Sequence, residues 1–257
     1  MIKFIRFLGK HSLNLITAVG QVVILFYEAM RNIRWIHYDR VLYIQQMYRL
    51  GFKALPLVTL VSIFAGAVSG WQGAYQLADT LPKSFFGQIV PAGILAEMGP
   101  VLVALVLAGR NGSSISAEIA TMKVTEQVDA LEAMAIDPVR FLVTPRVVST
   151  ILMMPLLIMV GNFVAIFTAG AIGDWFFDIN FAMYFNSFQS IFVTHEDFYP
   201  SIYKGIVFGI AIGVLSCWVG LHSKRGASGV GRAAIDAFVY SAIMVLACDY
   251  LVAVIVY

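Results

Sequence analysis

Five long apolar segments alternate with shorter polar ones along the chain. Each can form a helix of about 20 residues, the length that crosses the hydrocarbon core of a bilayer. We predict spans at 54–78, 88–109, 147–172, 205–221 and 233–256. The pattern therefore predicts an all-α integral membrane protein.

The first apolar run, residues 13–26, is a sixth candidate span. Polar residues recur near helical spacing along it, so one face of the helix is polar. Lys and Arg residues flank the run on both sides, and a span would carry one of these groups across the membrane. We expect an amphipathic helix in the cytoplasmic interface instead, within an interfacial region at 1–50.

Basic residues orient the five spans. With the N-terminus in the cytoplasm, 15 of the 17 Lys and Arg residues fall in cytoplasmic segments, and only Lys83 and Lys204 fall outside. This follows the positive-inside rule and predicts a periplasmic C-terminus. Residues 110–146 then form a cytoplasmic loop, and 173–204 form an external loop rich in aromatic residues.

Composition supports this fold class. Hydrophobic residues make up 60% of the chain and charged residues 12%, about half the charged share of a soluble domain. The net charge of +2 indicates no nucleic-acid surface. No linker or low-complexity segment divides the chain, so we predict one domain over 1–257, with the five-helix region at 51–257.

Glycines recur at four-residue spacing in two spans. Gly66 and Gly70 lie in one, and Gly205, Gly209 and Gly213 in another. Small residues at this spacing let helix backbones approach closely in a membrane. The spacing fits packing within one subunit as well as it fits a homodimer seam.

Two acidic residues fall inside predicted spans. An ionisable residue at the bilayer centre costs about 2.5–3.5 kcal/mol, so Glu97 indicates a cavity, a relay or a ligand site. Pro91 and Pro100 should bend the helix that carries it. For Asp249 a functional and a structural role are equally supported, whereas Asn162 fits a contact between helices.

No motif for bond chemistry is present in the sequence. There is no GxxxxGK[ST] loop, the four histidines are scattered without a metal-ligand spacing, and no Ser/His/Asp or Cys/His grouping occurs. We predict that the chain has no catalytic residue, no metal site and no cofactor of its own.

A compact charged segment, MKVTEQVDALEAM, stands in the middle of this apolar chain. Its spacing predicts an amphipathic helix at about 122–136, with Thr125 capping the start and Asp137–Pro138 ending it. Acidic residues line one face of this helix. It is either a solvated loop helix or a docking surface for a partner.

Residues 97–146 closely resemble the MlaE/YrbE family of ABC-transporter permeases. The run reads EMGPVLVALVLAGRNGSSISAEIATMKVTEQVDALEAMAIDPVRFLVTPR, and the family shows E-L/M-G-P-V, A-G-R-x-G-S, A-E-I/L-x-x-M-[KR]-x-T-E-Q and D-P-x-R in this order. A looser resemblance covers 69–77 and 227–255. Asn111 departs from the pattern, since members often have a small or hydrophobic residue there.

The resemblance implies a homodimer in the bacterial inner membrane. A cytoplasmic ATPase dimer, which binds ATP and Mg²⁺, would lie beneath it, and MCE-domain proteins would form a ring on the periplasmic face. Such complexes move lipids, with phospholipids as the expected cargo, between the inner membrane and the outer envelope, traffic on which outer membrane lipid asymmetry depends.

The resemblance also assigns roles to residues. The coupling helix that contacts the ATPase falls on 122–136, with contacts expected from Lys123, Thr125, Glu126, Gln127, Asp129 and Glu132. The lipid cavity falls at the dimer seam, with Glu97, Met98, Trp71, Gln72 and Tyr75 as its residues. Two other classes remain open: an ion-coupled carrier or channel that uses Glu97 and Asp249, and a membrane scaffold.

Overall fold

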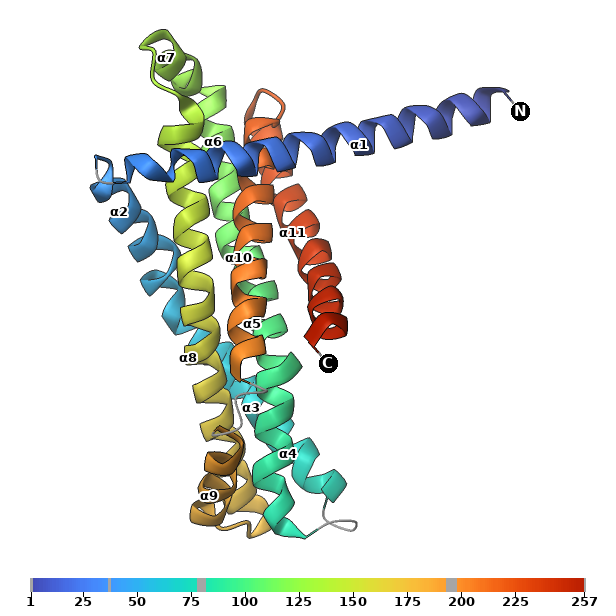
Figure 1. The fold of residues 1–257 in the computed structure, drawn as a ribbon, viewed down its shortest axis with the longest axis vertical. Helices are drawn as coiled ribbons and strands as arrows, with labels where there is room; N and C mark the ends of the chain where they lie inside the picture. The colour runs from blue at the N-terminus through green and yellow to red at the C-terminus, as the bar shows by residue number, and fades with distance from the viewer. Residues whose placement is uncertain (1, 37, 78–81, 193–197, 257) are drawn as a thin grey trace.

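The computed structural model describes residues 2–36, 38–77, 82–192 and 198–256, and these residues form helices joined by short turns (Figure 1). The α-helices are α1 Ile2–Arg31, α2 Arg40–Leu50, α3 Leu55–Leu77, α4 Phe86–Gly93, α5 Gly99–Leu107, α6 Ser113–Val124, α7 Gln127–Ala133, α8 Thr144–Phe177, α9 Phe181–Phe192, α10 Phe198–Leu221 and α11 Ala227–Val256. Three π-helical segments interrupt them: η4 Ile94–Met98, η5 Ala108–Gly112 and η6 Val139–Val143. Short 3-10 turns make up the rest: η1 Asn32–Trp35, η2 Phe52–Ala54 and η3 Lys83–Phe85.

Five continuous helical stretches have the length and composition of membrane spans, as the sequence predicts. They are Arg40–Gln76, Phe86–Val124, Val139–Phe177, Phe198–Leu221 and Ala227–Val256. Every stretch is longer than its predicted span, because polar helical turns continue the apolar core at one or both ends. In the second stretch, the π-helical segments η4 and η5 join α4, α5 and α6 without a break, and in the third stretch η6 leads directly into α8.

Helix α1 does not run with the five spans. Figure 1 shows it lying across one end of the bundle, over α8 and α10, with its N-terminus far from the other helices. Exposed apolar residues along it alternate with the residues that pack on the bundle, such as Leu25 and Ala29. This position agrees with the predicted interfacial helix and not with a sixth span.

The glycine repeats lie at contacts within one subunit. A Cβ on Gly66 or Gly70 would come within 3 Å of the backbone of Ala165 or Ala169, so these glycines let α3 lie directly against α8. A Cβ on Gly205 or Gly209 would come within 3 Å of the α8 backbone from the other side, and one on Gly213 would come to 3.3 Å from Thr150 and Val147 of the same helix. The structure thus assigns both repeats to packing around α8, which lies between α3 and α10.

The predicted external loop is largely helical. Helix α8 continues to Phe177, α9 follows, and α10 already begins at Phe198. Tyr184 of α9 is buried against Phe86 of α4 and donates a hydrogen bond to the carbonyl of Ile166, 2.9 Å away. Burial raises the pKa of this phenol. Residues 193–197 of the predicted loop lie outside the described residues.

Candidate functional site

A buried lysine joins the two acidic residues that the sequence places in spans. Lys204 Nζ of α10 lies 2.9 Å from Glu97 Oε2 and 2.7 Å from Asp249 Oδ1 of α11. The Lys204 side chain is 0% exposed, Asp249 is 17% exposed and Glu97 is 46% exposed. We call these three residues the charge cluster; it opens to the surface of the bundle on the Glu97 side.

The backbone around Glu97 explains how the cluster is held. Glu97 lies in the π-helical segment η4, between Pro91 inside α4 and Pro100 in the first turn of α5. Proline has no N–H group, so Pro100 cannot bond the carbonyl of Ala96 one turn earlier. Lys204 Nζ donates to this carbonyl at 2.8 Å. The same lysine therefore satisfies a backbone acceptor and two carboxylates.

The prediction that Lys204 lies in an external loop is wrong. Helix α10 begins six residues before Lys204, and the side chain points into the bundle. A count of charges treats every lysine as solvent-exposed, whereas this one is paired inside a span. Lys83, the other lysine expected outside, lies at the α9 end of the bundle and donates to the carbonyls of Phe177 and Asp178.

Asn162 forms a contact between helices next to the charge cluster. Its Nδ2 donates to Ser201 Oγ of α10 at 2.8 Å. Its Oδ1 faces Gly99, where a Cβ would come within 1.8 Å of the oxygen. A larger residue at position 99 would have to displace the Asn162 side chain and would crowd the carbonyl of Ile94, which gives a physical reason for the glycine of the EMGP motif.

The other residues predicted for a lipid cavity lie on the exposed side of α3 and η4. Met98 is exposed, and its sulfur accepts a hydrogen bond from Ser69 Oγ at 3.4 Å. Trp71 instead packs edge-on against Phe176 and Phe177 at the end of α8. Gln72 and Tyr75 are exposed, and the described contacts join neither of them, nor Trp71, to Glu97.

The predicted coupling helix is shorter than expected and begins later. Helix α6 runs through to Val124, Glu126 takes a left-handed conformation (φ 60°), and α7 occupies only Gln127–Ala133. One continuous helix over 122–136 is therefore wrong. Thr125 does not cap α7: its hydroxyl donates to the carbonyl of Thr121 in the preceding turn.

The residues predicted to contact an ATPase divide into two groups. Lys123 is partly buried, and its Nζ donates to the carbonyls of Leu221 and Ser223 at the end of α10. The other five are exposed at the tip that α6 and α7 form beyond the bundle (Figure 1): Thr125, Glu126, Gln127, Asp129 and Glu132. The tip thus carries three acidic side chains, whereas Lys123 secures its base to α10.

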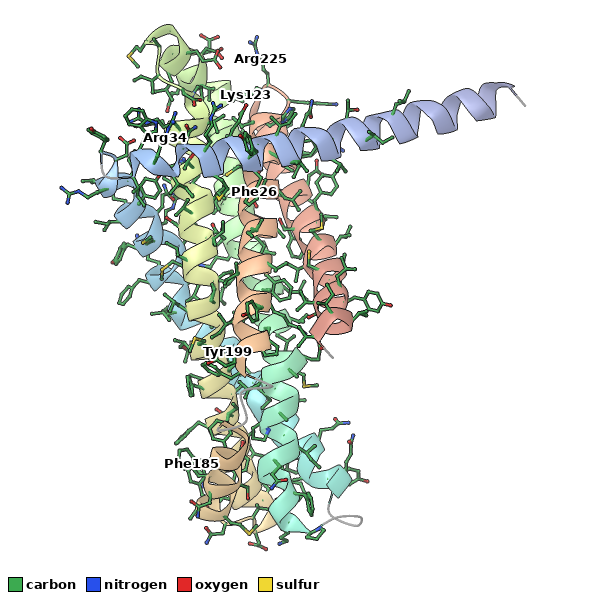
Figure 2. The ribbon with its side chains drawn as sticks, in the orientation of Figure 1. Phe26, Arg34, Lys123, Phe185, Tyr199 and Arg225 are labelled. Atoms are coloured by element: carbon green, nitrogen blue, oxygen red, sulfur yellow. The ribbon has the colours of Figure 1, made fainter. Side chains whose placement is uncertain are left out.

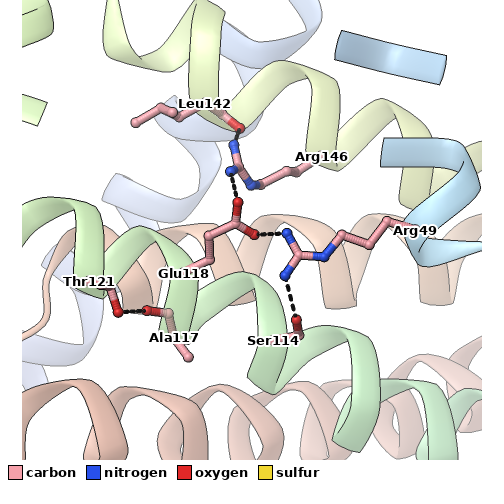
Figure 3. A network of polar contacts seen from close by, with 7 residues as sticks. All are labelled: Arg49, Ser114, Ala117, Glu118, Thr121, Leu142 and Arg146. Carbon is pink, nitrogen blue, oxygen red and sulfur yellow. Dashed lines mark hydrogen bonds and ion pairs between the residues drawn. The ribbon is translucent and has the colours of Figure 1, made fainter. Parts of the chain in front are cut away.

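A second charged site, which the sequence analysis did not single out, links three helices near this tip. Glu118 of α6 pairs with Arg146 of α8 at 2.9 Å and with Arg49 of α2 (Figure 3). Arg146 is 4% exposed and also donates to the carbonyl of Leu142 at 2.6 Å. We call Arg49, Glu118 and Arg146 the arginine network. Glu118 and Arg146 belong to the AEI and PR parts of the motif run, and these parts are the sequence signal for the network.

These features define a class of protein. Five candidate spans, a crosswise helix at one end and a charge cluster between spans describe a multi-pass helical membrane protein. At the α6–α7 end, a tip with three exposed acidic side chains extends beyond the bundle.

Sequence comparison then gives the family. The family model described as Permease MlaE matches residues 43–255, and the chain belongs to this family of ABC transporter permeases. It is a non-catalytic permease subunit, and membership implies an ATPase partner.

Three relatives each match this chain over 78% or more of their own length. A probable ABC transporter permease protein of Rickettsia prowazekii (strain Madrid E) is 36% identical over 253 residues, which cover 98% of this chain and 97% of the relative. The intermembrane phospholipid transport system permease protein MlaE of Haemophilus influenzae is 30% identical over 258 residues, covering 100% and 98%. A probable ABC transporter permease protein of Synechocystis sp. is 33% identical over 207 residues, covering 80% and 78%.

Proposed function

We propose that this chain is the membrane subunit of a transporter that moves phospholipids between the bacterial inner membrane and the outer envelope. The observation that carries the proposal is the full-length similarity to the Haemophilus influenzae protein, whose name states intermembrane phospholipid transport. The whole chain, 1–257, acts as one permease domain. A separate ATPase binds ATP and Mg²⁺ and supplies the energy.

The proposed orientation places the α6–α7 tip in the cytoplasm. Three acidic residues, Glu126, Asp129 and Glu132, are exposed there and can pair with basic residues of an ATPase. Two such permeases form a homodimer. Helix α11 supports the proposed homodimer, because most of its apolar side chains are exposed. This is expected of a surface that faces lipid or a second copy of the chain. The α9 end then faces the periplasm and an MCE-domain protein.

The charge cluster is the proposed polar contact for a lipid that moves along the permease. Glu97 is the most exposed of its three members and lies beside the exposed Met98, so a lipid at this surface meets one carboxylate within an apolar wall. The cluster also argues against an ion-coupled carrier. Lys204 Nζ already lies between Glu97 and Asp249, where a coupling cation would have to bind.

Reconstitution tests the proposal. The full-length chain and its ATPase would be placed in proteoliposomes, and ATP-dependent transfer of a labelled phospholipid would be measured. We expect transfer with the unchanged chain and reduced transfer with Glu97→Gln. Absence of ATP-dependent lipid movement, together with normal ATPase binding, would refute the transport assignment.

A charge-reversed tip tests the coupling surface separately. The double variant Glu126→Lys and Asp129→Lys should detach the ATPase while the permease stays folded. The matched control is Asp174→Lys with Asp178→Lys at the α9 end, since Glu126 and Asp178 both have positive φ and the change in charge is identical. Equal ATPase binding by both double variants would contradict the coupling role of the tip.

A further inference from the structure

We propose that the seam between α10 and α11 holds one phospholipid with an anionic headgroup, at a site separate from the charge cluster. A polar pocket and an apolar groove lie in line along this seam. The pocket would bind the phosphate, and the groove would bind the acyl chains. This inference concerns binding alone and stands without the transport proposal.

The pocket lies where α10 ends and α11 begins. Its volume is about 180 Å³, and Lys224, Arg232 and His222 line it together with Ser223 and Asp236. Among the described residues, neither Lys224 nor Arg232 forms an ion pair, and Ser223 Oγ is buried without a hydrogen-bond partner. With Asp236 as the single acid, the lining residues carry a net positive charge.

Lys123 holds the wall of this pocket in place. Its Nζ donates to the carbonyls of Leu221 and Ser223, so the turn that follows α10 is fixed and a further positive charge lies behind it. Figure 2 shows Lys123 and Arg225 at the same end of the molecule. Cationic pockets between membrane helices at headgroup level suit anionic lipid headgroups.

The groove continues the pocket toward the middle of the bundle. Its volume is about 240 Å³, and its walls are almost wholly apolar: Val22, Val23, Phe26, Val207, Ile210, Ala211, Val214, Leu215, Met244 and Cys248. Leu215 in the groove and Trp218 in the pocket are three residues apart on α10, a rise of about 4.5 Å. On α11, Tyr240 in the pocket and Met244 in the groove are one turn apart.

Helix α1 fixes the depth of the site in the membrane. Trp218 Nε1 donates to Gln21 Oε1 of α1 at 3.3 Å, and Phe26 of α1 forms part of the groove. Figure 2 shows Phe26 beneath α1, on the side of the spans. Because α1 lies across the ends of the spans, the pocket lies at the level of lipid headgroups and the groove lies below them.

The phosphate pocket and the charge cluster lie far apart along α10, although the groove extends from the pocket toward the cluster. Lys204 lies on α10 and His222 directly follows the end of that helix; they are 18 residues apart, which corresponds to about 27 Å along the helix axis. A lipid in the α10–α11 seam therefore does not reach the charge cluster with its phosphate. Substitutions in the pocket, at Lys224 and Arg232, therefore remove no contact of the charge cluster.

Native mass spectrometry of the purified full-length chain tests the assignment. We would compare retention of dioleoyl phosphatidylglycerol, which is anionic, with that of dioleoyl phosphatidylcholine, which is zwitterionic. Lys224→Ala with Arg232→Ala should lower phosphatidylglycerol retention roughly tenfold, since each cation near the surface contributes to binding of an anionic lipid. Arg31→Ala with Arg40→Ala removes two exposed charges elsewhere and should leave retention unchanged.

A second variant tests the groove. Ala211→Phe places a ring in the groove and should lower phosphatidylglycerol retention without any change of charge. Glycerol phosphate, which has the headgroup but no chains, should fail to displace the lipid. Equal retention of the two lipids by the unchanged chain, an equal loss in the Arg31 and Arg40 control, or displacement by glycerol phosphate would overturn the proposal.

Discussion

Replacing Lys204 by methionine isolates the energy of the charge cluster. Methionine is also long and unbranched and fills irregular space, so Lys204→Met removes the charge with little loss of packing. The ammonium group it removes makes two ion pairs, with Glu97 and Asp249, and one hydrogen bond to the carbonyl of Ala96. The variant leaves two carboxylates and one carbonyl without this donor.

The expected loss follows from the distances and the burial. At an effective dielectric constant of about 20, two unit charges roughly 3 Å apart attract by about 5.5 kcal/mol before desolvation is counted. Desolvation of the ammonium offsets much of this, and the half-exposed Glu97 is screened by its surroundings. Removal of one partner from a buried pair costs about 3–5 kcal/mol. We expect Lys204→Met to lower the free energy of unfolding by about 3–4 kcal/mol.

Steric trapping in bicelles measures this free energy without heating the protein. The double variant Lys204→Met with Asp249→Asn should be more stable than Lys204→Met alone, because it no longer buries an unpaired carboxylate. Glu97→Gln should cost less than Asp249→Asn, since Glu97 is the more exposed acid. The reasoning fails if the free energy of unfolding of Lys204→Met lies within about 1 kcal/mol of that of the unchanged chain. It also fails if the double variant Lys204→Met with Asp249→Asn is less stable than Lys204→Met alone.

Two further substitutions have matched controls in the same assay. Gly66→Ala places a Cβ 2.2 Å from the α8 backbone and should lower the free energy of unfolding by roughly 1–3 kcal/mol. Its control, Gly93→Ala, meets open space and should raise that free energy by about 0.5–1 kcal/mol. A loss of stability at both positions would contradict the close contact of α3 with α8. Glu118→Gln removes both ion pairs of the arginine network and should cost about 3 kcal/mol, whereas the exposed Glu132→Gln should stay within about 0.5 kcal/mol. Equal effects of the two Glu substitutions would show that the network contributes nothing to stability.

The fold was predictable from the sequence because membranes leave few choices. Backbone N–H and C=O groups in lipid must form hydrogen bonds within a helix, so the length of the apolar segments is enough to predict five spans. The structure has five helical stretches that are long and apolar enough to cross a membrane. The Lys and Arg residues on both sides of 13–26 predict that this segment lies in the interface, which agrees with the position of α1 across the end of the bundle. The span limits could not be predicted, since helical structure continues beyond the apolar core through segments such as Ala108–Gly112, which contains Arg110 and Asn111.

The pairing of buried charges could not be predicted from the pattern. Glu97 and Asp249 stood out because each is an acid within an apolar run, but Lys204 lies seven residues into α10, beside the polar end of the run. Its burial depends on Ala96 and Asp249, which are distant in sequence. The role of Glu118 could not be predicted for the same reason, because its two partner arginines lie on α2 and α8, far from it in sequence.

The turn at Glu126 shows a different limit of sequence reasoning. Helical spacing of Val124, Val128 and Leu131 continues across 122–136, yet the chain turns at Glu126 with a positive φ, which non-glycine residues seldom adopt. Lys123, held by the carbonyls at the end of α10, fixes the direction of α6 immediately before this turn. Tertiary contact therefore overrides a regular pattern at the point where α7 leaves the bundle.

The charge balance of the cluster bears on how the site could work. Two carboxylates face one ammonium, so in formal charges the cluster carries one negative charge that no further ion pair among the described residues neutralises. Lys204 and Asp249 are the buried members and lie 2.7 Å apart, whereas Glu97 is 46% exposed. Burial of an unpaired charge is costly, so the excess charge is stabilised best on Glu97, where water can reach it. The exposed acid is thus the member of the cluster that a passing polar headgroup would meet first.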